Sequence, residues 1–228
     1  MDSVNPIASM TDTRSFRPGG RGYRSGRCER CGLHPKACVC SALPQVENDT
    51  AIHLVVHWRE LAKPSSTARL ASAMLTQCNL LIRGGPNPEA GRRVESDLAA
   101  LDPMSTWLLY PDADAEPIEG LVENIGVAER PTALVVPDGT WSQTRRLIRR
   151  YAALGQLRRV RLPARDTLYL LRRGRSPGLL CTIEAIALAL SAIEGASVGE
   201  PLLQGFRDWQ TKALQVRGSL IESTPEET

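Results

Sequence analysis

The segment LVVPDGTWSQTRRLIRR, residues 134–150, passes from a strand pattern to a helix pattern within a few positions. Leu134–Pro137 is a continuous apolar run of the kind found in strands buried on both faces. Asp138 follows this run, and Thr140 with Gln143 matches a capping box, so we expect a helix that begins at Thr140. In open α/β sheets, ligands bind outside the carboxyl ends of strands, which is where this carboxylate is expected to lie.

The expected helix is strongly two-sided. At 100° per residue its four arginines fill a single arc of about 140°. Apolar side chains occupy the complementary face. The arginines are Arg145, Arg146, Arg149 and Arg150, and the apolar residues are Trp141, Leu147, Ile148, Tyr151 and Leu154. The pattern predicts a helix that packs through its apolar side and presents a basic ridge.

Outside this segment, apolar strand patterns alternate with helical patterns along the chain. The expected strands are 52–58, 80–83, 106–110, 132–137 and 158–163, and the expected helices are 65–75, 89–101, 140–154, 181–195 and 200–216. Strands that alternate with helices and read as continuous apolar runs indicate an α/β fold. We therefore expect a mainly parallel sheet with helices on both faces.

The positive charge is unevenly distributed, although the net charge of the chain is only +3. Residues 145–175 hold eleven arginines against one acidic residue, Asp166, and residues 1–30 hold six arginines against three acidic residues. This asymmetry predicts a polyanionic partner. A GC-rich genome would explain the use of 25 arginines and three lysines, but it would not explain the clustering. We interpret the pattern as nucleic-acid binding.

The composition indicates a cytoplasmic protein with one main domain. At 228 residues and 42% hydrophobic, the chain can bury a substantial core. It has no run of 18 apolar residues, and its first residues, MDSVNPIASM, lack the charged start and apolar run of a signal peptide. Residues 1–26 are rich in Gly, Ser and Arg, which predicts a disordered tail.

Four cysteines within thirteen residues predict a structural metal site. The spacing is Cys28-x2-Cys31-x6-Cys38-x-Cys40. Four thiolates form the closed tetrahedral shell that Zn²⁺ prefers, and a reducing compartment disfavours disulfides. A reduced cluster without metal is the alternative, and His34 could replace one cysteine as a ligand. Cys78 and Cys181 lie in apolar contexts and are expected to be packed thiols.

Asp138 is the candidate acid–base residue. The N-terminal end of the following helix offers free N–H groups and a positive dipole end, which hold a carboxylate in its ionised form. An ionised carboxylate at a strand end is a candidate base. The alternative is that Asp138 only caps the helix and that Gly139 only forms a bend.

Four motifs, in the same order along the chain, resemble those of the DTW-domain family over about residues 27–215. Asp138-x-Thr140-Trp141 resembles the D-x-T-W signature that names the family. The cysteine cluster, HWRELAKPSSTAR (57–69) and CTIEAIALAL (181–190) resemble its other three motifs. The chain departs from the family at Ser66, where the family commonly has Asn.

This resemblance implies a fold and an activity. DTW proteins are similar to tRNA-uridine aminocarboxypropyltransferases, which transfer the 3-amino-3-carboxypropyl group of S-adenosyl-L-methionine to N3 of a tRNA uridine and release methylthioadenosine. They also resemble SPOUT proteins, whose fold contains a trefoil knot. The implied organisation is a tail (1–26), a four-cysteine zinc knuckle (27–45), a catalytic domain (46–217) and a flexible tail (218–228), with tRNA as partner and no membrane.

The resemblance also implies roles for individual residues. Asp138 is expected to accept the N3 proton. The other residues expected to contact the co-substrate lie in three segments. They are Ser66, Thr67 and Arg69; Val136, Pro137, Gly139, Thr140 and Trp141; and Thr182 and Glu184.

Within these segments the first helix start is expected to hold the carboxylate of the co-substrate. Glu184 could take its ammonium group or a ribose hydroxyl. The backbone near residues 135–139 is expected to contact adenine. Trp141 could stack on uracil or adenine, or could simply pack the helix against the sheet. His57 and Glu60 are expected to be hydrogen-bonded structural residues.

The expected RNA contacts are phosphate contacts, which supply affinity and salt dependence rather than sequence choice. The residues chosen for this role are Arg145, Arg149, Arg172, Arg173 and Arg175.

Two other functions are compatible with the residues. The first is a SPOUT-type RNA methyltransferase, which would bind the same co-substrate and release S-adenosylhomocysteine. The second is a zinc-knuckle RNA-binding protein without catalysis, which would have no affinity for the co-substrate. The products and the binding of S-adenosyl-L-methionine therefore separate the three hypotheses.

Overall fold

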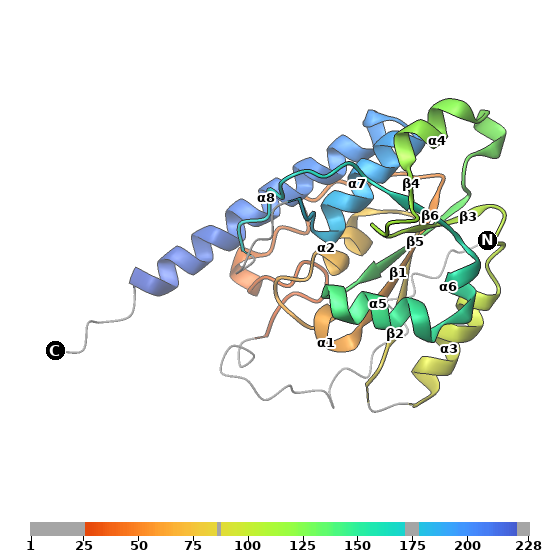
Figure 1. Ribbon diagram of the computed structural model, residues 1–228. Coiled ribbons are helices and arrows are strands. Elements are labelled where there is room, and N and C mark those ends of the chain that lie inside the picture. Colours follow the sequence, from red (N-terminus) through yellow and green to blue (C-terminus); the bar gives the residue numbers. More distant parts are fainter. Residues whose placement is uncertain (1–25, 86–87, 172–177, 223–228) are drawn as a thin grey trace, which may run out of the picture.

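A six-stranded, all-parallel sheet forms the centre of the protein in the computed structural model (Figure 1), which describes residues 26–85, 88–171 and 178–222. The strand order is β2-β1-β5-β3-β6-β4. The strands are β1 (Ala51–His57), β2 (Cys78–Arg83), β3 (Thr106–Leu109), β4 (Glu116–Pro117), β5 (Ala133–Asp138) and β6 (Arg158–Arg161). The predicted α/β fold with a mainly parallel sheet is thus confirmed.

Helices cover both faces of this sheet (Figure 1). They are α1 (Trp58–Leu61), α2 (Thr67–Met74), α3 (Pro88–Ala99), α4 (Ile118–Asn124), α5 (Trp141–Arg150), α6 (Ala152–Gln156), α7 (Thr182–Ile193) and α8 (Ala196–Glu222), with short 3-10 helices at Pro35–Ala37 and Val127–Glu129. Helices α2, α4, α7 and α8 contact one another in one layer, and α3, α5 and α6 contact one another in the other. Among the described residues, no helix has the length and apolar character needed to cross a bilayer.

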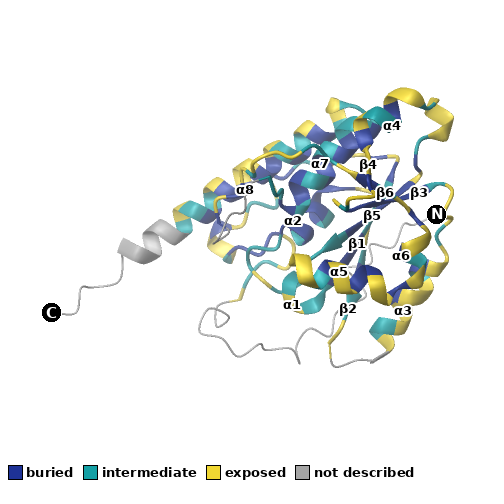
Figure 2. Ribbon diagram, viewed as in Figure 1, coloured by how far each residue is buried: buried dark blue, intermediate teal, exposed yellow. Residues whose placement is uncertain are grey.

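Two hydrophobic cores lie on opposite sides of the sheet, because successive side chains of a strand point to opposite faces. In β5, Leu134 and Val136 belong to the core beneath α2, α7 and α8. Val135 belongs to the core beneath α3, α5 and α6. Figure 2 shows the resulting dark band of buried residues along the central strands.

The parallel arrangement brings several strand ends to one edge of the sheet. Strand β5 lies between β1 and β3, with Val56 opposite Asp138 on one side and Leu108 opposite Val135 on the other. The carboxyl ends of β1, β3, β5 and β6 therefore meet at a single edge, as expected for a ligand-binding α/β sheet.

Several predicted boundaries differ from the structure. The helix predicted over 140–154 is divided at Tyr151, whose extended backbone separates α5 from α6. Tyr151 is buried, so packing of its ring against the core accompanies this break. Strand β4 and helix α4 were not predicted, because β4 has only two residues and both are exposed.

The C-terminal helix is longer than predicted. Helix α8 begins at Ala196 and continues to Glu222, into the stretch 218–228 that was predicted as a flexible tail. Most of the predicted N-terminal tail (1–25) and residues 223–228 lie outside the described residues. The trefoil knot stays a prediction.

Candidate active site

A cavity of about 430 Å³ opens at the carboxyl edge of the sheet. Its lining comes from the ends of β3, β5 and β6, the start of α2, and the chain that leads into α7. This volume lies within the range of about 300–1,000 Å³ that is usual for small-molecule sites. Residues predicted from the sequence that line it are Ser66, Thr67, Val136, Pro137, Asp138, Gly139, Thr140, Trp141 and Thr182.

Asp138 is the last residue of β5 and is half-buried in the cavity wall. Its Oδ1 accepts a hydrogen bond from the Thr182 hydroxyl, 44 positions further along the chain. Thr182 is the first residue of α7, so this contact joins the tip of the central strand to the start of a buried helix. The hydrogen bond limits rotation of the carboxylate, which is the kind of support that a positioned base requires.

The turn after Asp138 starts α5 as the sequence predicted. Thr140 is the N-cap residue, and its N–H donates to Gln143 Oε1 at 2.7 Å. Gly139 has a φ of 149°, and a Cβ at this position would lie 2.9 Å from Gln143 Oε1. The close approach explains why glycine fits between the carboxylate and the helix. The predicted capping box is confirmed.

Trp141 does not lie on the buried face of α5, which was one of the two positions that the sequence left open. Its side chain is 38% exposed and lines the cavity. The Trp141 and Tyr110 rings lie with centroids 5.9 Å apart and are tilted by 55°. Trp141 is the first helical residue, so its ring extends from the end of the helix toward the cavity rather than down onto the sheet.

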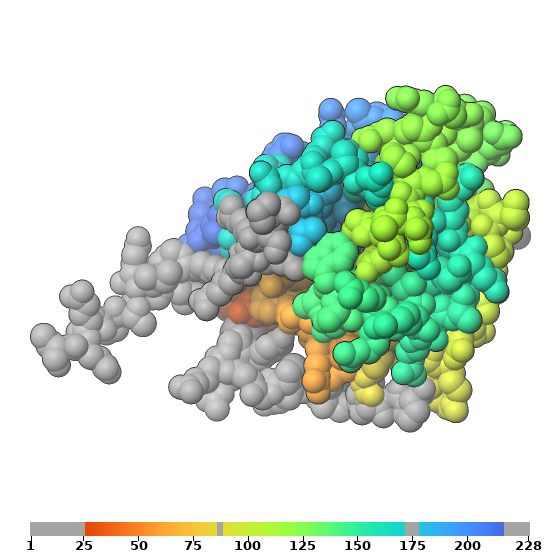
Figure 3. All heavy atoms as spheres, viewed as in Figure 1, coloured from red at the N-terminus to blue at the C-terminus, as the bar shows by residue number. Residues whose placement is uncertain are grey.

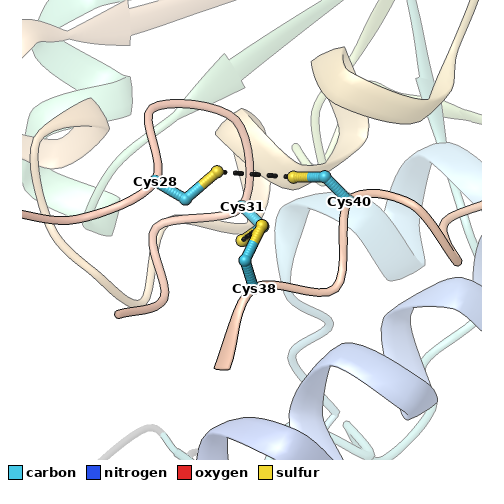
Figure 4. A group of neighbouring side chains, drawn as sticks. All are labelled: Cys28, Cys31, Cys38 and Cys40. Carbon is cyan, nitrogen blue, oxygen red and sulfur yellow. Dashed lines mark hydrogen bonds between the residues drawn. The ribbon is translucent and has the colours of Figure 1, made fainter. Parts of the chain in front are cut away.

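The four N-terminal cysteines converge, as the spacing predicted (Figure 4). Their sulfur atoms all lie within 4.8 Å of one another. The Sγ–Sγ distance is 3.4 Å between Cys28 and Cys40 and 3.8 Å between Cys31 and Cys38. With metal–sulfur bonds of about 2.3 Å, the sulfurs of a tetrahedral zinc site lie about 3.8 Å apart. The cluster can therefore hold a zinc-sized ion.

The electrostatics of the cluster also suit a metal. Burial raises the pKa of the Cys28 thiol, but hydrogen bonds from the backbone of Cys31 and Arg30 and from Cys40 and Cys38 lower it further than that, to about 7. Burial is the main cause that raises the pKa of Cys31 and of Cys40. Because metals bind the thiolate form, one readily ionised thiol favours entry of a cation.

A known family matches the part of the chain that contains both the cavity and the cysteine cluster. The family model described as the DTW domain matches residues 25–214. The chain belongs to the DTW-domain family. The resemblance drawn from the D-x-T-W signature and the three accompanying motifs is thereby confirmed.

Three relatives of this DTW protein carry the same name, tRNA-uridine aminocarboxypropyltransferase 2. The chain is 32% identical over 180 residues to the Drosophila melanogaster protein, which covers 75% of this chain and 68% of the relative. It is 28% identical over 174 residues to the Macaca fascicularis and Mus musculus proteins. Each matched region covers 75% of this chain and 57% of the relative. The chain thus spans little more than half the length of the mammalian relatives it matches.

Of the three ligands predicted at the start of α2 in this DTW domain, two line the cavity and one does not. Ser66 caps the helix by accepting from the Arg69 N–H at 3.3 Å, and both Ser66 and Thr67 line the cavity. Arg69 is not among the lining residues, and its guanidinium donates to the Leu61 carbonyl. The same guanidinium lies against Gly32, where a Cβ would come within 2.9 Å of it. Arg69 therefore joins the cavity rim to the cysteine knuckle.

Glu184 is the other predicted ligand that does not line the cavity of the DTW domain. It is 2% exposed, and both carboxylate oxygens accept from the chain itself. Oε1 accepts from the Leu168 N–H at 2.6 Å, and Oε2 accepts from the Thr167 hydroxyl at 2.5 Å and from the Cys181 N–H at 2.8 Å. Its carboxylate therefore binds the segment that precedes α7 and does not face the cavity.

Gln210 of α8 holds the same segment from a second side. Its Oε1 accepts from the Leu170 N–H at 2.7 Å, and its Nε2 donates to the Leu168 carbonyl at 3.0 Å. Between these two positions, Tyr169 lines the cavity, and its hydroxyl donates to the Ser65 carbonyl at 2.7 Å. Side chains thus fix an irregular stretch of backbone as a cavity wall.

Sequence reasoning missed several lining residues of this domain. Tyr110 and Lys63 lay within segments that the sequence analysis had already identified, the expected strand 106–110 and the motif 57–69. Arg161 lines the cavity at the end of β6. Tyr169 had no signal, because residues 162–169 form neither a helix nor a strand.

His57 and Glu60 form the hydrogen bonds that were expected, and Glu60 also lines the cavity. His57 Nδ1 accepts from the Arg59 N–H at 3.2 Å and so caps α1. Burial, and then the charges of Arg83 and Arg59, lower the pKa of His57. Glu60 pairs with Lys63 and accepts from Gln143 Nε2 at 3.5 Å, so it joins α1 to α5 at the cavity rim.

The arginine-rich segment is divided between two uses. Arg158 pairs with Glu116 at 3.1 Å, and Arg159 pairs with Asp112 at 2.8 Å. Arg161 Nε donates to the Ala115 carbonyl at 2.9 Å. These three arginines therefore bind the segment 112–116, which comprises the loop before β4 and the first residue of β4. Part of the clustered positive charge is therefore engaged by acidic and carbonyl groups of the same chain.

Helix α5 keeps the predicted basic ridge. All four of its arginines are exposed, and none forms an ion pair with another described residue: Arg145, Arg146, Arg149 and Arg150. Figure 3 shows the helix at the surface of this face of the molecule. Arg172, Arg173 and Arg175, which were also predicted to contact RNA, lie outside the described residues.

The knuckle packs into the same core as the DTW sheet rather than standing apart. Cys31 and Leu33 are buried in the core that contains α7 and α8. The indole N–H of Trp209 in α8 donates to the Cys31 carbonyl at 2.8 Å. Arg30 donates to the Ala73 carbonyl of α2 at 3.0 Å. The region predicted as a separate knuckle (27–45) is therefore in contact with two helices of the main fold.

Proposed function

We propose that this DTW protein is a tRNA-uridine aminocarboxypropyltransferase that uses S-adenosyl-L-methionine as its co-substrate. The observation that carries the proposal is Asp138, a carboxylate held by Thr182 at the wall of a cavity that can admit a small molecule. The names of the relatives support both the group that is transferred and the uridine that receives it.

The proposed step requires removal of one proton. When bound, the co-substrate supplies a sulfonium whose adjacent Cγ is open to nucleophilic attack. The N3–Cγ bond forms as the Cγ–S bond breaks, so the sulfonium leaves as neutral methylthioadenosine. Asp138 takes the proton of uridine N3 as this nitrogen becomes bonded to carbon. Thr182 keeps the carboxylate in position by donating to its Oδ1.

The remaining lining residues position the co-substrate. The N–H groups at the start of α2, beside Ser66 and Thr67, are oriented to hold its carboxylate. The backbone of residues 136–140 contacts its adenine. Lys63 adds a positive charge at the rim. Holding the reacting carbon in line with N3 supplies rate through orientation, without covalent catalysis by the protein.

The tRNA lies across the face that carries α5. Trp141, exposed at the cavity, stacks on the uracil once this base is turned out of the folded RNA. Arg145 and Arg149 contact phosphates, together with Arg172, Arg173 and Arg175 of the adjoining segment. These contacts supply affinity that falls with rising salt concentration.

The cysteine cluster holds zinc in a structural role. Cys28, Cys31, Cys38 and Cys40 supply the four sulfur ligands. A site closed by four thiolates leaves no position for a reactive water, so zinc orders the knuckle against α8.

The decisive experiment is mass spectrometry of nucleosides from tRNA incubated with the protein and S-adenosyl-L-methionine. Wild type should form aminocarboxypropyluridine and methylthioadenosine. Asp138→Asn should lower kcat by about 10²- to 10⁴-fold, while calorimetry shows retained co-substrate binding. Asp208→Asn, on the exposed face of α8, is the matched control and should keep the rate.

Three results would contradict the proposal in different ways. Release of S-adenosylhomocysteine would indicate methyl transfer. A lack of co-substrate binding would indicate an RNA-binding protein without catalysis. A full rate for Asp138→Asn would remove the base assignment and leave the activity in place.

A further inference from the structure

Helix α5 has two sides that face different parts of the molecule. At 100° per residue, Trp141 and Arg145 lie toward one side, while Gln143, Arg146 and Arg150 lie toward the other. Trp141 contacts Tyr110 at the end of β3, and Gln143 hydrogen-bonds Glu60 of α1. The basic ridge therefore extends from the cavity toward the ends of β1 and β2, beside α1 in Figures 1 and 3.

Arg83, a residue that sequence analysis did not select, lies where this second side meets the sheet. It is the last residue of β2 and lies opposite His57, the last residue of β1. Gly84 follows with a φ of 76° and packs so closely on His57 that a Cβ would lie 2.7 Å from the ring nitrogen Nε2. The chain turns sharply here and holds Arg83 at the carboxyl edge.

The guanidinium of Arg83 is not satisfied within the described part of the protein. Its Nε is buried and has no hydrogen-bond partner, and it forms no ion pair among the described residues. A buried donor of a charged group without an acceptor is costly, commonly by more than a neutral one. Such a group suggests a ligand that arrives with acceptor oxygens.

Two further arginines, Arg146 and Arg150, act on Arg83 from helix α5. Burial lowers the pKa of Arg83, and the positive charges of Arg150 and Arg146 lower it further, whereas Tyr151 and Glu60 oppose the change. Glu60 is already paired with Lys63. The like charges of Arg146 and Arg150 thus act against the charge of Arg83, and a bound anion would reduce this repulsion.

We propose that Arg83, Arg146 and Arg150 form a phosphate-binding site for the backbone of the tRNA, separate from the cavity. The inference rests on the proposed function, because the uridine must reach the cavity while its flanking strand crosses α5. Phosphate is favoured over the carboxylates of an acidic protein, since the ridge is continuous with the cavity rim where the nucleotide must enter. Guanidinium groups also match phosphate oxygens in a bidentate geometry.

The site can be tested by titrating the binding of unfractionated tRNA with salt, using fluorescence anisotropy. Arg83→Gln should weaken binding by roughly tenfold near physiological salt and reduce the slope of log K against log salt by about one. Arg83→Lys should retain most of the slope. Arg207→Gln, which removes an exposed arginine from α8, is the matched control and should change neither quantity.

Two further measurements separate binding from a purely structural role. Without RNA, Arg83→Gln should unfold at the same or a higher temperature than wild type, because repulsion is removed. In the transferase assay its KM for tRNA should rise about tenfold, with a much smaller change in kcat.

The outcomes distinguish this site from the proposed activity. An unchanged salt slope for Arg83→Gln, or a loss equal to that of Arg207→Gln, would overturn the site even if wild type transfers the group. A lower unfolding temperature that accounts for the weaker binding would also overturn it. If wild type binds tRNA without transfer, the proposed function fails, and the salt slopes still decide whether the phosphate site exists.

Discussion

Two walls of the cavity are built in different ways. The wall formed by β5 and α5 consists of regular elements joined by a capping box, and the hydrogen bonds that start its helix connect residues three or four positions apart. Its long-range hydrogen bonds join side chains, from Thr182 to Asp138 and from Gln143 to Glu60. The wall formed by Thr167–Leu171 has no helix or strand. Its backbone is held by Glu184 and Gln210, at separations of 16 to 42 positions.

This difference shows how the site is stabilised. The backbone of the first wall depends mainly on local capping and on the central strand, although its Asp138 side chain is held from α7 by Thr182. The second wall depends on α7 and α8 being in place, since each supplies a buried polar side chain to otherwise unpaired backbone groups. Damage to the helical layer should therefore affect the second wall more strongly than the first.

Removal of the metal should have the largest effect, because the knuckle supports α8 beside the second wall. Trp209, which binds the Cys31 carbonyl, directly precedes Gln210. A chelator should lower the unfolding temperature by about 10 °C or more, since structural zinc contributes several kcal/mol. Scanning calorimetry with and without chelator measures this, and chelator presaturated with zinc is the control. An unchanged unfolding temperature would show that the second wall is independent of the knuckle.

Glu184→Ala should have the next largest effect. It leaves three donors without an acceptor in the interior, at a cost of about 3–5 kcal/mol. Urea unfolding and calorimetry should report lower stability together with weaker binding of S-adenosyl-L-methionine. Glu200→Ala, at an exposed position of α8, is the control. A stable Glu184→Ala variant that fails only in co-substrate binding would instead favour direct ligand contact by this carboxylate.

Gln210→Ala should cost about 2 kcal/mol, because two backbone hydrogen bonds of the second wall are lost. The KM for S-adenosyl-L-methionine should rise more than kcat falls, since Tyr169 lines the cavity and its hydroxyl donates to the Ser65 carbonyl beside the proposed co-substrate site. Gln204→Ala, exposed on the same helix, should behave as wild type in both measurements. Equal losses in the two glutamine variants would argue against a specific role for Gln210.

Gln143→Ala should have the smallest effect of the four. It removes the acceptor for the Thr140 N–H at the first wall, which costs about 1 kcal/mol in typical caps. Chemical unfolding against Gln156→Ala, an exposed glutamine at the end of α6, provides the comparison. If Gln143→Ala were more damaging than Glu184→Ala, the proposed contrast between the two walls would be wrong.

The predictable parts of the site are those whose partners are close in sequence. The Cys28–Cys40 spacing and the capping box at Thr140 were both read correctly, because each is a short segment with its own chemistry. The sequence left the position of Trp141 open, because helical periodicity does not indicate whether the first residue of a helix packs on the sheet or extends beyond it. Arg69 was matched by motif position, but its side chain turned toward the knuckle.

The sequence by itself determined the parallel α/β fold, the four-cysteine cluster and the placement of Asp138 at the tip of a buried strand. Each follows from hydrophobic periodicity or from short-range spacing, which act between neighbouring residues. Only the tertiary structure decided that Thr182 holds Asp138, that Glu184 and Gln210 build a wall, and that Arg83 lies opposite His57 at the carboxyl edge of the sheet. These outcomes depend on which strand ends and helices the folded chain brings to one edge of the sheet. Residues far apart in the sequence form these contacts, so a local sequence pattern does not predict them.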